Sequence, residues 1–335
     1  MSSAQSQHTS GHLPGLTRKK IGSKFCFFTA NERQVTRPDV IARCESLGIP
    51  PAYQHVWIAT DPKAHLQATA LDKLGRKHYF YHSAWQARLE AAKFAHLLPF
   101  ASALGAVRRQ VNRDLRLRGL PKDKILAAIV RLLDTKYVRV GNEVYAKNHH
   151  SYGLTTLLQR HVYGRGLRMH LIFKGKSGVA HDVSLKDERV IKVIAACQDL
   201  PGQELFAYLD DLGESRRLYS EDVNHYLHVT TGAQITAKDF RTWHGSVVAL
   251  AYLARHEASA SLTERKRTVV AAVKVAAEAL RNTAAVCRHS YIHPKILEHY
   301  LSGNFKLPRS LRILRRRYRH LTPDELNLVS LLERV

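Results

Sequence analysis

Two places in the chain combine basic side chains with backbone geometry that suits a phosphate group. Residues 169–185, MHLIFKGKSGVAHDVSL, alternate apolar and polar residues on both sides of a Lys- and Gly-bearing tip at 174–178, which predicts a β-hairpin. Residues 236–239 read Thr-Ala-Lys-Asp, the form of a helix capping box, and therefore place Arg241 in or next to the first helical turn. A guanidinium beside the free N–H groups of a helix start favours an anion. Both places predict phosphate binding.

The overall charge points to a polyanionic partner. The 335 residues carry 52 Lys and Arg against 28 Asp and Glu, a net charge of +24, beside an ordinary apolar share of 45%. Nucleic acid is the commonest partner of such a chain, and an anionic membrane surface is the open alternative. No apolar run approaches the ~20 residues that span a bilayer, and the N-terminus lacks a secretory signal. The four cysteines lack CxxC spacing, which predicts reduced thiols, no disulfide and no zinc.

The elements that must carry these residues change character along the chain. Short β-prone runs at 25–29, 55–60, 66–70 and 77–82, with a helix near Pro38–Leu47, predict a small β-rich domain. In the last of these strands Lys77, Tyr79 and Tyr81 share one face, which could meet DNA or belong to the core or an edge. From about residue 84 apolar residues recur at helical spacing. Thr283 is expected to cap a short helix that runs to Tyr291.

These patterns predict an α+β fold, with a small β-rich N-terminal domain and a larger, mainly helical domain that contains one β-hairpin. We expect a disordered basic tail at 1–20, the β-rich domain at 21–88, the helical domain at 89–300 and an Arg-rich C-terminal segment at 301–335. The stretch FKLPRSLRILRRRYR in that segment holds seven Lys and Arg and no acid, so it resembles a backbone-contacting tail more than a core helix.

Common enzyme signatures are missing. The chain has no GxxxxGK[ST], GxGxxG, HExxH or GxSxG motif, so ATP, dinucleotide, zinc-protease and serine-hydrolase chemistry lack support. The histidine pairs 149–150 and 289/293 lack a carboxylate or thiol to complete a metal site. We therefore expect neither a metal nor a cofactor.

Six segments, read in order, carry a specific resemblance. They are YVRVGNEVYAKNHHSYGLTTLLQRHV (137–162), FKGKSG (173–178), DLPGQELFAYLD (199–210), SEDVNHYL (220–227), ITAKDFRTWHGS (235–246) and NTAAVCRHSYIHP (282–294). In order and spacing they resemble the motifs of type IB DNA topoisomerases, in the compact bacterial and poxvirus-like branch. The resemblance covers about residues 20–300, including the QAT and GRKHYFYH stretches near the N-terminus.

The resemblance implies an ATP- and metal-independent isomerase that relaxes positive and negative supercoils through a 3′-phosphotyrosyl intermediate. Tyr291 would be the nucleophile. Arg139 and Arg241 would hold the non-bridging phosphate oxygens, and Lys176 would protonate the leaving 5′ oxygen. Asn282 stands where poxvirus-like members have a histidine, so it can donate a hydrogen bond but carry no charge.

The resemblance further implies a C-shaped clamp, a β-rich lobe and a helical catalytic lobe, around duplex DNA. The candidate DNA contacts are Gln67, Lys77, Tyr79, Tyr81, Lys174 and Lys238. We expect a cytoplasmic, nucleoid-associated monomer without small-molecule cofactor or membrane partner.

Two alternatives stay open at the level of the sequence. A tyrosine recombinase or integrase shares the Arg, Lys, Arg and Tyr chemistry, but usually has His where this chain has Lys238. A non-catalytic architectural DNA-binding protein would need only the charge and the basic tail, and it predicts that Tyr291→Phe changes nothing.

Overall fold

The structure, a computed structural model, describes residues 14–308 and 310–334. The chain divides into two compact units, the first ending at Ala92 and the second beginning at Lys93. Each unit is described by itself. The first unit is an antiparallel sheet of order β2-β1-β3-β4-β5 with two helices. Its elements are β1 (Gly15–Ile21), β2 (Lys24–Phe28), α1 (Pro38–Ser46), β3 (Gln54–Ala59), β4 (Leu66–Leu71), β5 (Lys77–Tyr81) and the start of α2 (Ser83–Ala95).

The four predicted β-prone runs form strands β2 to β5, and the predicted helix is α1. The sheet's core includes Phe27, Ile58 and Ala68, each at most 3% exposed. Strand β5 lies at the sheet edge, with its odd-numbered residues exposed. The predicted alternation along β5 is therefore confirmed.

The prediction of a disordered tail at 1–20 is wrong for its last residues. Residues 1–13 lie outside the described part of the chain. Strand β1 pairs with both β2 and β3, and Leu16 is only 5% exposed. Arg18 donates to the carbonyls of Ile49, Pro50 and Tyr53 at 2.7–3.0 Å. The basic residues of this segment thus belong to a strand that lies between β2 and β3 in the sheet.

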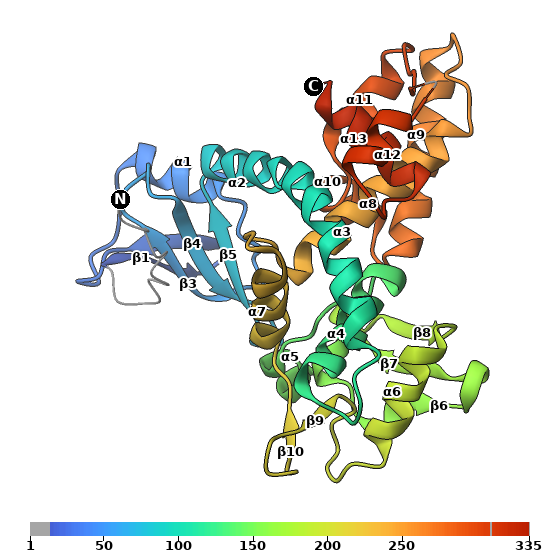
Figure 1. The fold of residues 1–335 in the computed structure, drawn as a ribbon. Coiled ribbons are helices and arrows are strands. Elements are labelled where there is room, and N and C mark those ends of the chain that lie inside the picture. The colour runs from blue at the N-terminus through green and yellow to red at the C-terminus, as the bar shows by residue number, and fades with distance from the viewer. Residues whose placement is uncertain (1–13, 309, 335) are drawn as a thin grey trace. The chain divides into compact units, whose positions relative to one another are not determined.

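The second unit is mainly helical, as Figure 1 shows. Its longer helices are α3 (Leu97–Asp114), α4 (Lys122–Lys136), α6 (Glu188–Gln198), α7 (Ser220–Thr231), α8 (Ala237–Ala254), α9 (Leu262–Ala279) and α13 (Pro323–Glu333). Its shorter helices are α5 (Glu143–His149), α10 (Ala284–Ser290), α11 (Pro294–Leu301) and α12 (Arg312–Arg317). Its strands are β6 (Val162–Tyr163), β7 (His170–Lys174) and β8 (Ala180–Ser184) in one sheet, and β9 (Ala207–Leu209) and β10 (Ser215–Arg217) in a ribbon.

Helix α8 is the centre of this unit, where it packs against α3, α4, α7, α9, α11 and α13. It begins with the predicted capping box, in which Asp239 accepts from the backbone N–H of Thr236 at 2.8 Å. Phe240 and Trp243 are fully buried and contact Phe100 of α3, so these aromatic residues belong to the core. Side chains on α8 can therefore be held rigidly.

The C-terminal segment predicted at 301–335 contains a core helix, which lies beyond the stretch 305–319 that is predicted to resemble a tail. In α13, Leu326, Leu328 and Val329 are fully buried, and the helix packs on α3 and α8. An arginine-rich stretch precedes this apolar helix, so the net charge of the segment gives no sign that it contains core residues. In α12, by contrast, Arg312, Arg315 and Arg316 are exposed.

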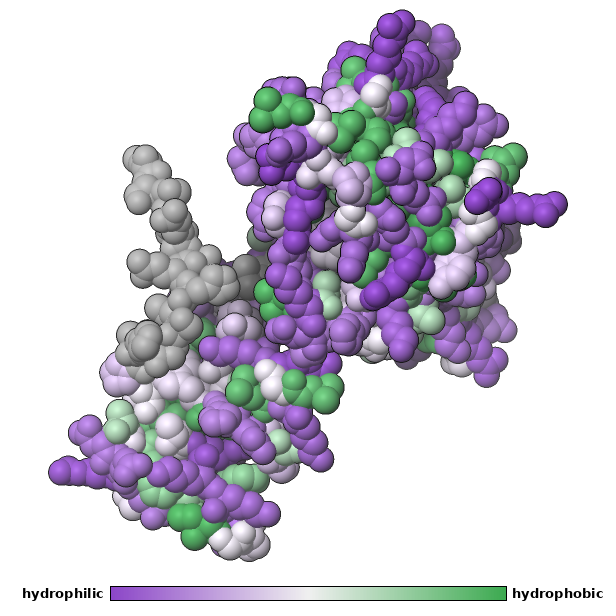
Figure 2. Space-filling model, turned by 90° about the horizontal axis from the view of Figure 1, so that it is seen from below, coloured by the Kyte–Doolittle hydropathy of each residue, from purple (hydrophilic) through white to green (hydrophobic). Residues whose placement is uncertain are grey.

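The face of the molecule in Figure 2 is mainly hydrophilic, with small hydrophobic areas between hydrophilic residues. Among the described helices, none is both long and apolar enough to cross a membrane.

Candidate active site

Tyr291 sits at the C-terminal end of α10. The hydroxyl of Thr283 caps the other end of this helix by accepting from the N–H of Val286, as the sequence predicted. The N–H of Tyr291 donates to the carbonyl of Cys287 at 2.9 Å. On the α8 side, a Cβ at Gly245 would lie 2.6 Å from the carbonyl oxygen of Tyr291. Glycine at 245 thus allows α8 to approach Tyr291 closely.

Arg241 reaches from α8 to Tyr291. The side chain is buried, and its guanidinium carbon lies 5.0 Å from the centre of the Tyr291 ring. Its Nη1 donates to the carbonyl of Tyr137 and its Nη2 donates to the carbonyl of Leu280, the latter at 2.8 Å. Burial, with a smaller effect of Arg139, lowers the pKa of Arg241 to about 10. The guanidinium is therefore held in place by two backbone groups.

Arg139 comes from the turn that follows α4. That helix ends at Tyr137, which adopts a left-handed conformation with φ of 57°. The carbonyl of Arg139 accepts from the N–H of Leu154 at 2.9 Å, and a Cβ at Gly153 would lie 2.7 Å from the same carbonyl oxygen. The RVGN turn is thus packed against the SYGLTT segment. It carries Arg139 close enough to affect the pKa values of both Arg241 and Tyr291.

Lys176 lies at the tip of the β7–β8 hairpin, as predicted. The N–H of Gly175 donates to the carbonyl of Val179 at 2.8 Å, and Ser177 has φ of 63°. Regular strand geometry stops at Lys174, so Lys176 lies in the turn and is not the next position on the Lys174 face of the strand. Lys176 is the lysine of this tip whose charge lowers the pKa of Tyr291.

Asn282 occupies the corner between α9 and α10. Its Oδ1 accepts from the N–H of Thr283 at 3.1 Å. Within the described residues its buried Nδ2 has no hydrogen-bond partner. The preceding Arg281 donates to the carbonyl of Asp182 in β8 at 2.6 Å. This contact joins the Asn282 corner to the hairpin that carries Lys176.

The positive charges act on the phenol. Burial raises the pKa of Tyr291, but three cations outweigh burial and hold its pKa below the ordinary value: Arg241, Arg139 and Lys176. A phenol of lowered pKa between guanidinium groups is suited to attack a phosphate diester, because the same charges stabilise the nucleophile and the phosphate oxygens.

Comparison with known proteins identifies the family of this site. Residues 82–314 match the family described as eukaryotic DNA topoisomerase I, catalytic core, and residues 24–72 match bacterial DNA topoisomerase IB, N-terminal domain. DNA topoisomerase 1B of Acanthamoeba polyphaga mimivirus is 32% identical over 296 residues, which is 86% of this chain and 88% of that protein. The chain belongs to the type IB DNA topoisomerases.

Two poxvirus proteins are similar to this type IB topoisomerase at greater distance. DNA topoisomerase 1B of Vaccinia virus (strain Western Reserve) and DNA topoisomerase I of Monkeypox virus are each 23% identical over 255 residues, 76% of this chain and 77% of each relative. The family predicted from the six motifs is confirmed, and a recombinase or an architectural protein is not favoured. All five predicted catalytic residues lie within the matched catalytic core.

The candidate DNA contacts of this topoisomerase differ in their exposure. Tyr79 and Tyr81 are 46% and 38% exposed, with ring centres 6.3 Å apart, and the Nζ of Lys77 lies over the Tyr79 ring. Lys174 and Lys238 are exposed as well. This exposure is compatible with their predicted contacts, which stay predictions.

Gln67 does not fit the prediction of a DNA contact. It is 4% exposed. Its Nε2 donates to the carbonyls of Pro62 and Ala64 at 3.1 and 2.6 Å, and its Oε1 accepts from Arg43 at 2.9 Å. Its polar atoms are thus used inside the first unit, where they hold the turn before β4.

No sequence pattern pointed to His181, which lies beside the site. It is 3% exposed and stacks on Phe173 with ring centres 4.7 Å apart. Among the described residues neither of its ring nitrogens has a hydrogen-bond partner. Burial first, and then the charges of Arg281, Arg139 and Arg241, lower the pKa of His181 to about 4. The imidazole is therefore neutral at pH 7.

Proposed function

We propose that this type IB topoisomerase relaxes positive and negative supercoils by cutting one strand of duplex DNA through a 3′-phosphotyrosyl bond to Tyr291. The observation that carries the proposal is the position of Arg241, whose guanidinium carbon lies 5.0 Å from the Tyr291 ring centre, with Arg139 and Lys176 close enough to lower the pKa of the same phenol. This set matches what an attack on a phosphate diester requires.

In the cleavage step the Tyr291 oxygen bonds to phosphorus and the bond from phosphorus to the 5′ oxygen breaks. The phenol proton passes to solvent, and Lys176 gives a proton to the leaving 5′ oxygen. After strand rotation the 5′ hydroxyl attacks the phosphotyrosine, releases Tyr291 and restores the diester. The phosphotyrosyl bond conserves the energy of the diester, so the cycle needs no ATP.

Three side chains would bind the phosphate during both steps. Arg139 and Arg241 hold the non-bridging oxygens, because guanidinium groups match their geometry and stabilise the charge that grows in the transition state. Asn282 donates from Nδ2, a buried group that is unpaired within the described residues. The two arginines and Lys176 supply the positive charge, Asn282 adds a neutral hydrogen-bond donor, and the proposed steps need no metal.

The remaining proposals concern the partner and its setting. We propose that residues 21–88 bind DNA through the exposed Lys77, Tyr79 and Tyr81 of β5, and that the catalytic part spans 89–300 together with α13. Contacts of a +24 chain with phosphates make binding strongly salt-dependent. The enzyme would act as a monomeric, C-shaped clamp in the cytoplasm, associated with the nucleoid.

Plasmid relaxation tests this function. Wild type, Tyr291→Phe and Tyr163→Phe are incubated with positively and with negatively supercoiled plasmid in EDTA without ATP. Tyr163 is an exposed tyrosine of β6 and serves as the matched control. We expect wild type and Tyr163→Phe to relax both plasmids and Tyr291→Phe to relax neither. Relaxation by Tyr291→Phe, or none by a folded wild type that binds DNA, would contradict the proposal.

A further inference from the structure

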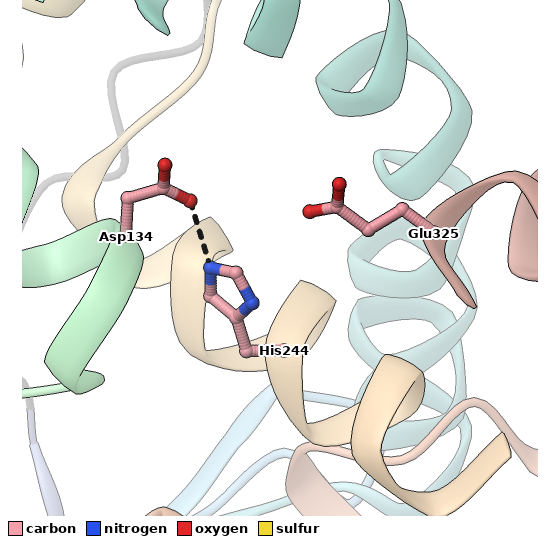
Figure 3. Close-up of side chains that lie close together, drawn as sticks. All are labelled: Asp134, His244 and Glu325. Atoms are coloured by element: carbon pink, nitrogen blue, oxygen red, sulfur yellow. Dashed lines mark hydrogen bonds and ion pairs between the residues drawn. The ribbon is translucent and has the colours of Figure 1, made fainter. Parts of the chain in front are cut away.

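A buried ion-pair cluster lies behind the active site, built from Arg108, Asp134, His244 and Glu325. We call it the Arg108 cluster. Arg108 donates to both oxygens of Asp134 at 2.8 and 2.9 Å and to both oxygens of Glu325 at 2.7 and 2.8 Å. Figure 3 shows His244 bonded to Asp134, at 3.0 Å, with the Glu325 carboxylate facing them. Both carboxylates are less than a tenth exposed.

The Arg108 cluster does not fit a metal ion, although Asp134, His244 and Glu325 are metal-ligating types whose ligand atoms lie within 4.8 Å of one another. The carboxylate oxygens already accept N–H groups: Arg108 and His244 at Asp134, and Arg108, Trp243 and the backbone of Thr322 at Glu325. A cation there would have to displace the Arg108 guanidinium. The cluster is therefore a buried network of hydrogen bonds and ion pairs that connects helices.

The cluster joins four helices, of which α8 and α13 are far in sequence from the consecutive helices α3 and α4. Arg108 comes from α3, Asp134 from α4, His244 from α8 and Glu325 from α13. Glu325 also accepts from Trp243 of α8 at 3.0 Å. Helix α13 lies beyond the matched catalytic core, which ends at residue 314. Helix α13, which lies outside the matched core, thus packs against α3 and α8, and α8 carries Arg241.

One residue connects the cluster to the phosphate-binding arginines. Tyr137 stacks on His244, with ring centres 4.4 Å apart, and its carbonyl accepts from Nη1 of Arg241. Tyr137 follows Asp134 by one helical turn and precedes Arg139 by two residues. Its left-handed backbone ends α4. The place of Tyr137 therefore sets both the acceptor that holds Arg241 and the start of the turn that carries Arg139.

We propose that Glu325, acting through Arg108, Asp134 and His244, is a positioning residue for Arg241 and Arg139. The proposal rests on the proposed function of these arginines as phosphate ligands. If Glu325 loses its charge, Arg108 loses one of its two partners and the end of α4 is free to shift against α8. Misplacing a phosphate ligand by about 1 Å can slow a reaction by about 100-fold.

The test compares Glu325→Gln with Asp324→Asn, which removes the same charge one residue earlier on α13. Single-turnover cleavage is measured on a duplex oligonucleotide whose cleavage site has been mapped with the wild-type enzyme. A second duplex carries a neutral methylphosphonate at that linkage. DNA affinity and melting temperature are measured in parallel. Because guanidinium groups contribute most to a charged phosphate, a defect that acts through Arg241 and Arg139 should be smaller on the neutral linkage.

We expect Glu325→Gln to slow cleavage of the phosphodiester about 10- to 100-fold, to slow cleavage of the methylphosphonate much less, and to leave DNA affinity unchanged. Asp324→Asn should behave as wild type on both substrates. Combining Glu325→Gln with Arg241→Gln should add little to the effect of Arg241→Gln alone. If Glu325→Gln fails to fold, His244→Gln, which breaks the link to Tyr137, should show the same selectivity between substrates.

Equal rate losses on both substrates, or rates like those of Asp324→Asn, would overturn the positioning role. Failure of the proposed function would be seen separately, because the wild-type enzyme would then form no covalent complex on the phosphodiester.

Discussion

Arg241 lies over the ring of Tyr291 while its nitrogens are held by the carbonyls of Tyr137 and Leu280. The central helix α8 thereby places a fixed positive charge beside the phenol, and the backbone of α4 and α9 determines where that charge is. The arrangement places the proposed nucleophile next to a proposed phosphate ligand.

The charge of Arg241 should set the pH dependence of cleavage. Burial raises the pKa of Tyr291, and Arg241 is the strongest of the charges that lower it. Replacing Arg241 by Gln should therefore move the rise of the cleavage rate with pH to higher pH, and slow the reaction by about 100- to 1,000-fold through loss of phosphate binding. Single-turnover rates between pH 6 and 10 test this. An unshifted profile would mean that Arg241 does not act on the phenol.

The close approach at Gly245 should matter for chemistry more than for stability. In Gly245→Ala the new Cβ would meet the carbonyl of Tyr291 at 2.6 Å, so Tyr291 must move. Gly105→Ala in α3 is the matched control, since its Cβ would meet the carbonyl of Arg319 at 2.6 Å. We expect both variants to lose about 1–3 kcal/mol of unfolding free energy. Only Gly245→Ala should also have a much lower cleavage rate than the wild type under conditions where the variant is folded. Similar cleavage by both variants would contradict this view of Gly245.

His181 should make the protein less stable in mild acid. Its pKa is about 4 in the folded state against 6.5 for a free histidine, so the unfolded chain binds a proton between these values and the folded protein does not. The free energy of unfolding contributed by His181 is fully present above pH 6.5 and is lost as pH falls toward 4. Between pH 7 and pH 5 the loss is about 2 kcal/mol.

Denaturant unfolding of wild type and His181→Gln at pH 7 and pH 5 isolates this contribution from that of other groups. The wild type should lose more stability between the two pH values than the variant does. Equal losses would show that the pKa of His181 is not lowered in the folded protein.

The exposed arginines of α12 should bind phosphates without supporting the fold. Replacing Arg312, Arg315 and Arg316 by Gln should weaken DNA binding and reduce the salt dependence of log K by about 0.9 for each phosphate that is no longer bound. Arg317→Gln is the control, because Arg317 pairs with Glu333 at 3.0 Å. Anisotropy titrations at several salt concentrations measure the slope. An unchanged slope in the triple variant would rule out phosphate binding by α12.

Local patterns made much of this site predictable. The capping box at Thr236 places Arg241, the Lys-Gly-Lys tip places Lys176, and Thr283 starts the helix that ends at Tyr291. Each depends on residues only a few positions apart. The β-rich unit was predictable for the same reason, because strands β2 to β5 are short runs of β-prone residues separated by turns.

What could not be read depends on contacts between distant residues. Glu325 contacts Arg108 across 217 positions, and nothing near residue 325 indicates that this carboxylate has an arginine partner on α3. The capping box at Thr322 and Glu325 is a local sign of a helix, but the preceding arginines give this part of the chain the charge pattern of an exposed tail. Strand β1 depends partly on distant contacts as well, because it also pairs with β3 and Arg18 binds carbonyls more than 30 residues away.

The most direct test of Tyr291 as the nucleophile is to map the covalent bond. Wild-type enzyme is denatured with detergent during cleavage of duplex DNA, digested with protease, and the peptide attached to DNA is identified by mass spectrometry. We expect a 3′-phosphate bonded to Tyr291 and a free 5′ hydroxyl on the other end of the cut strand. Attachment to another residue, or to a 5′-phosphate, would contradict the assignment of Tyr291.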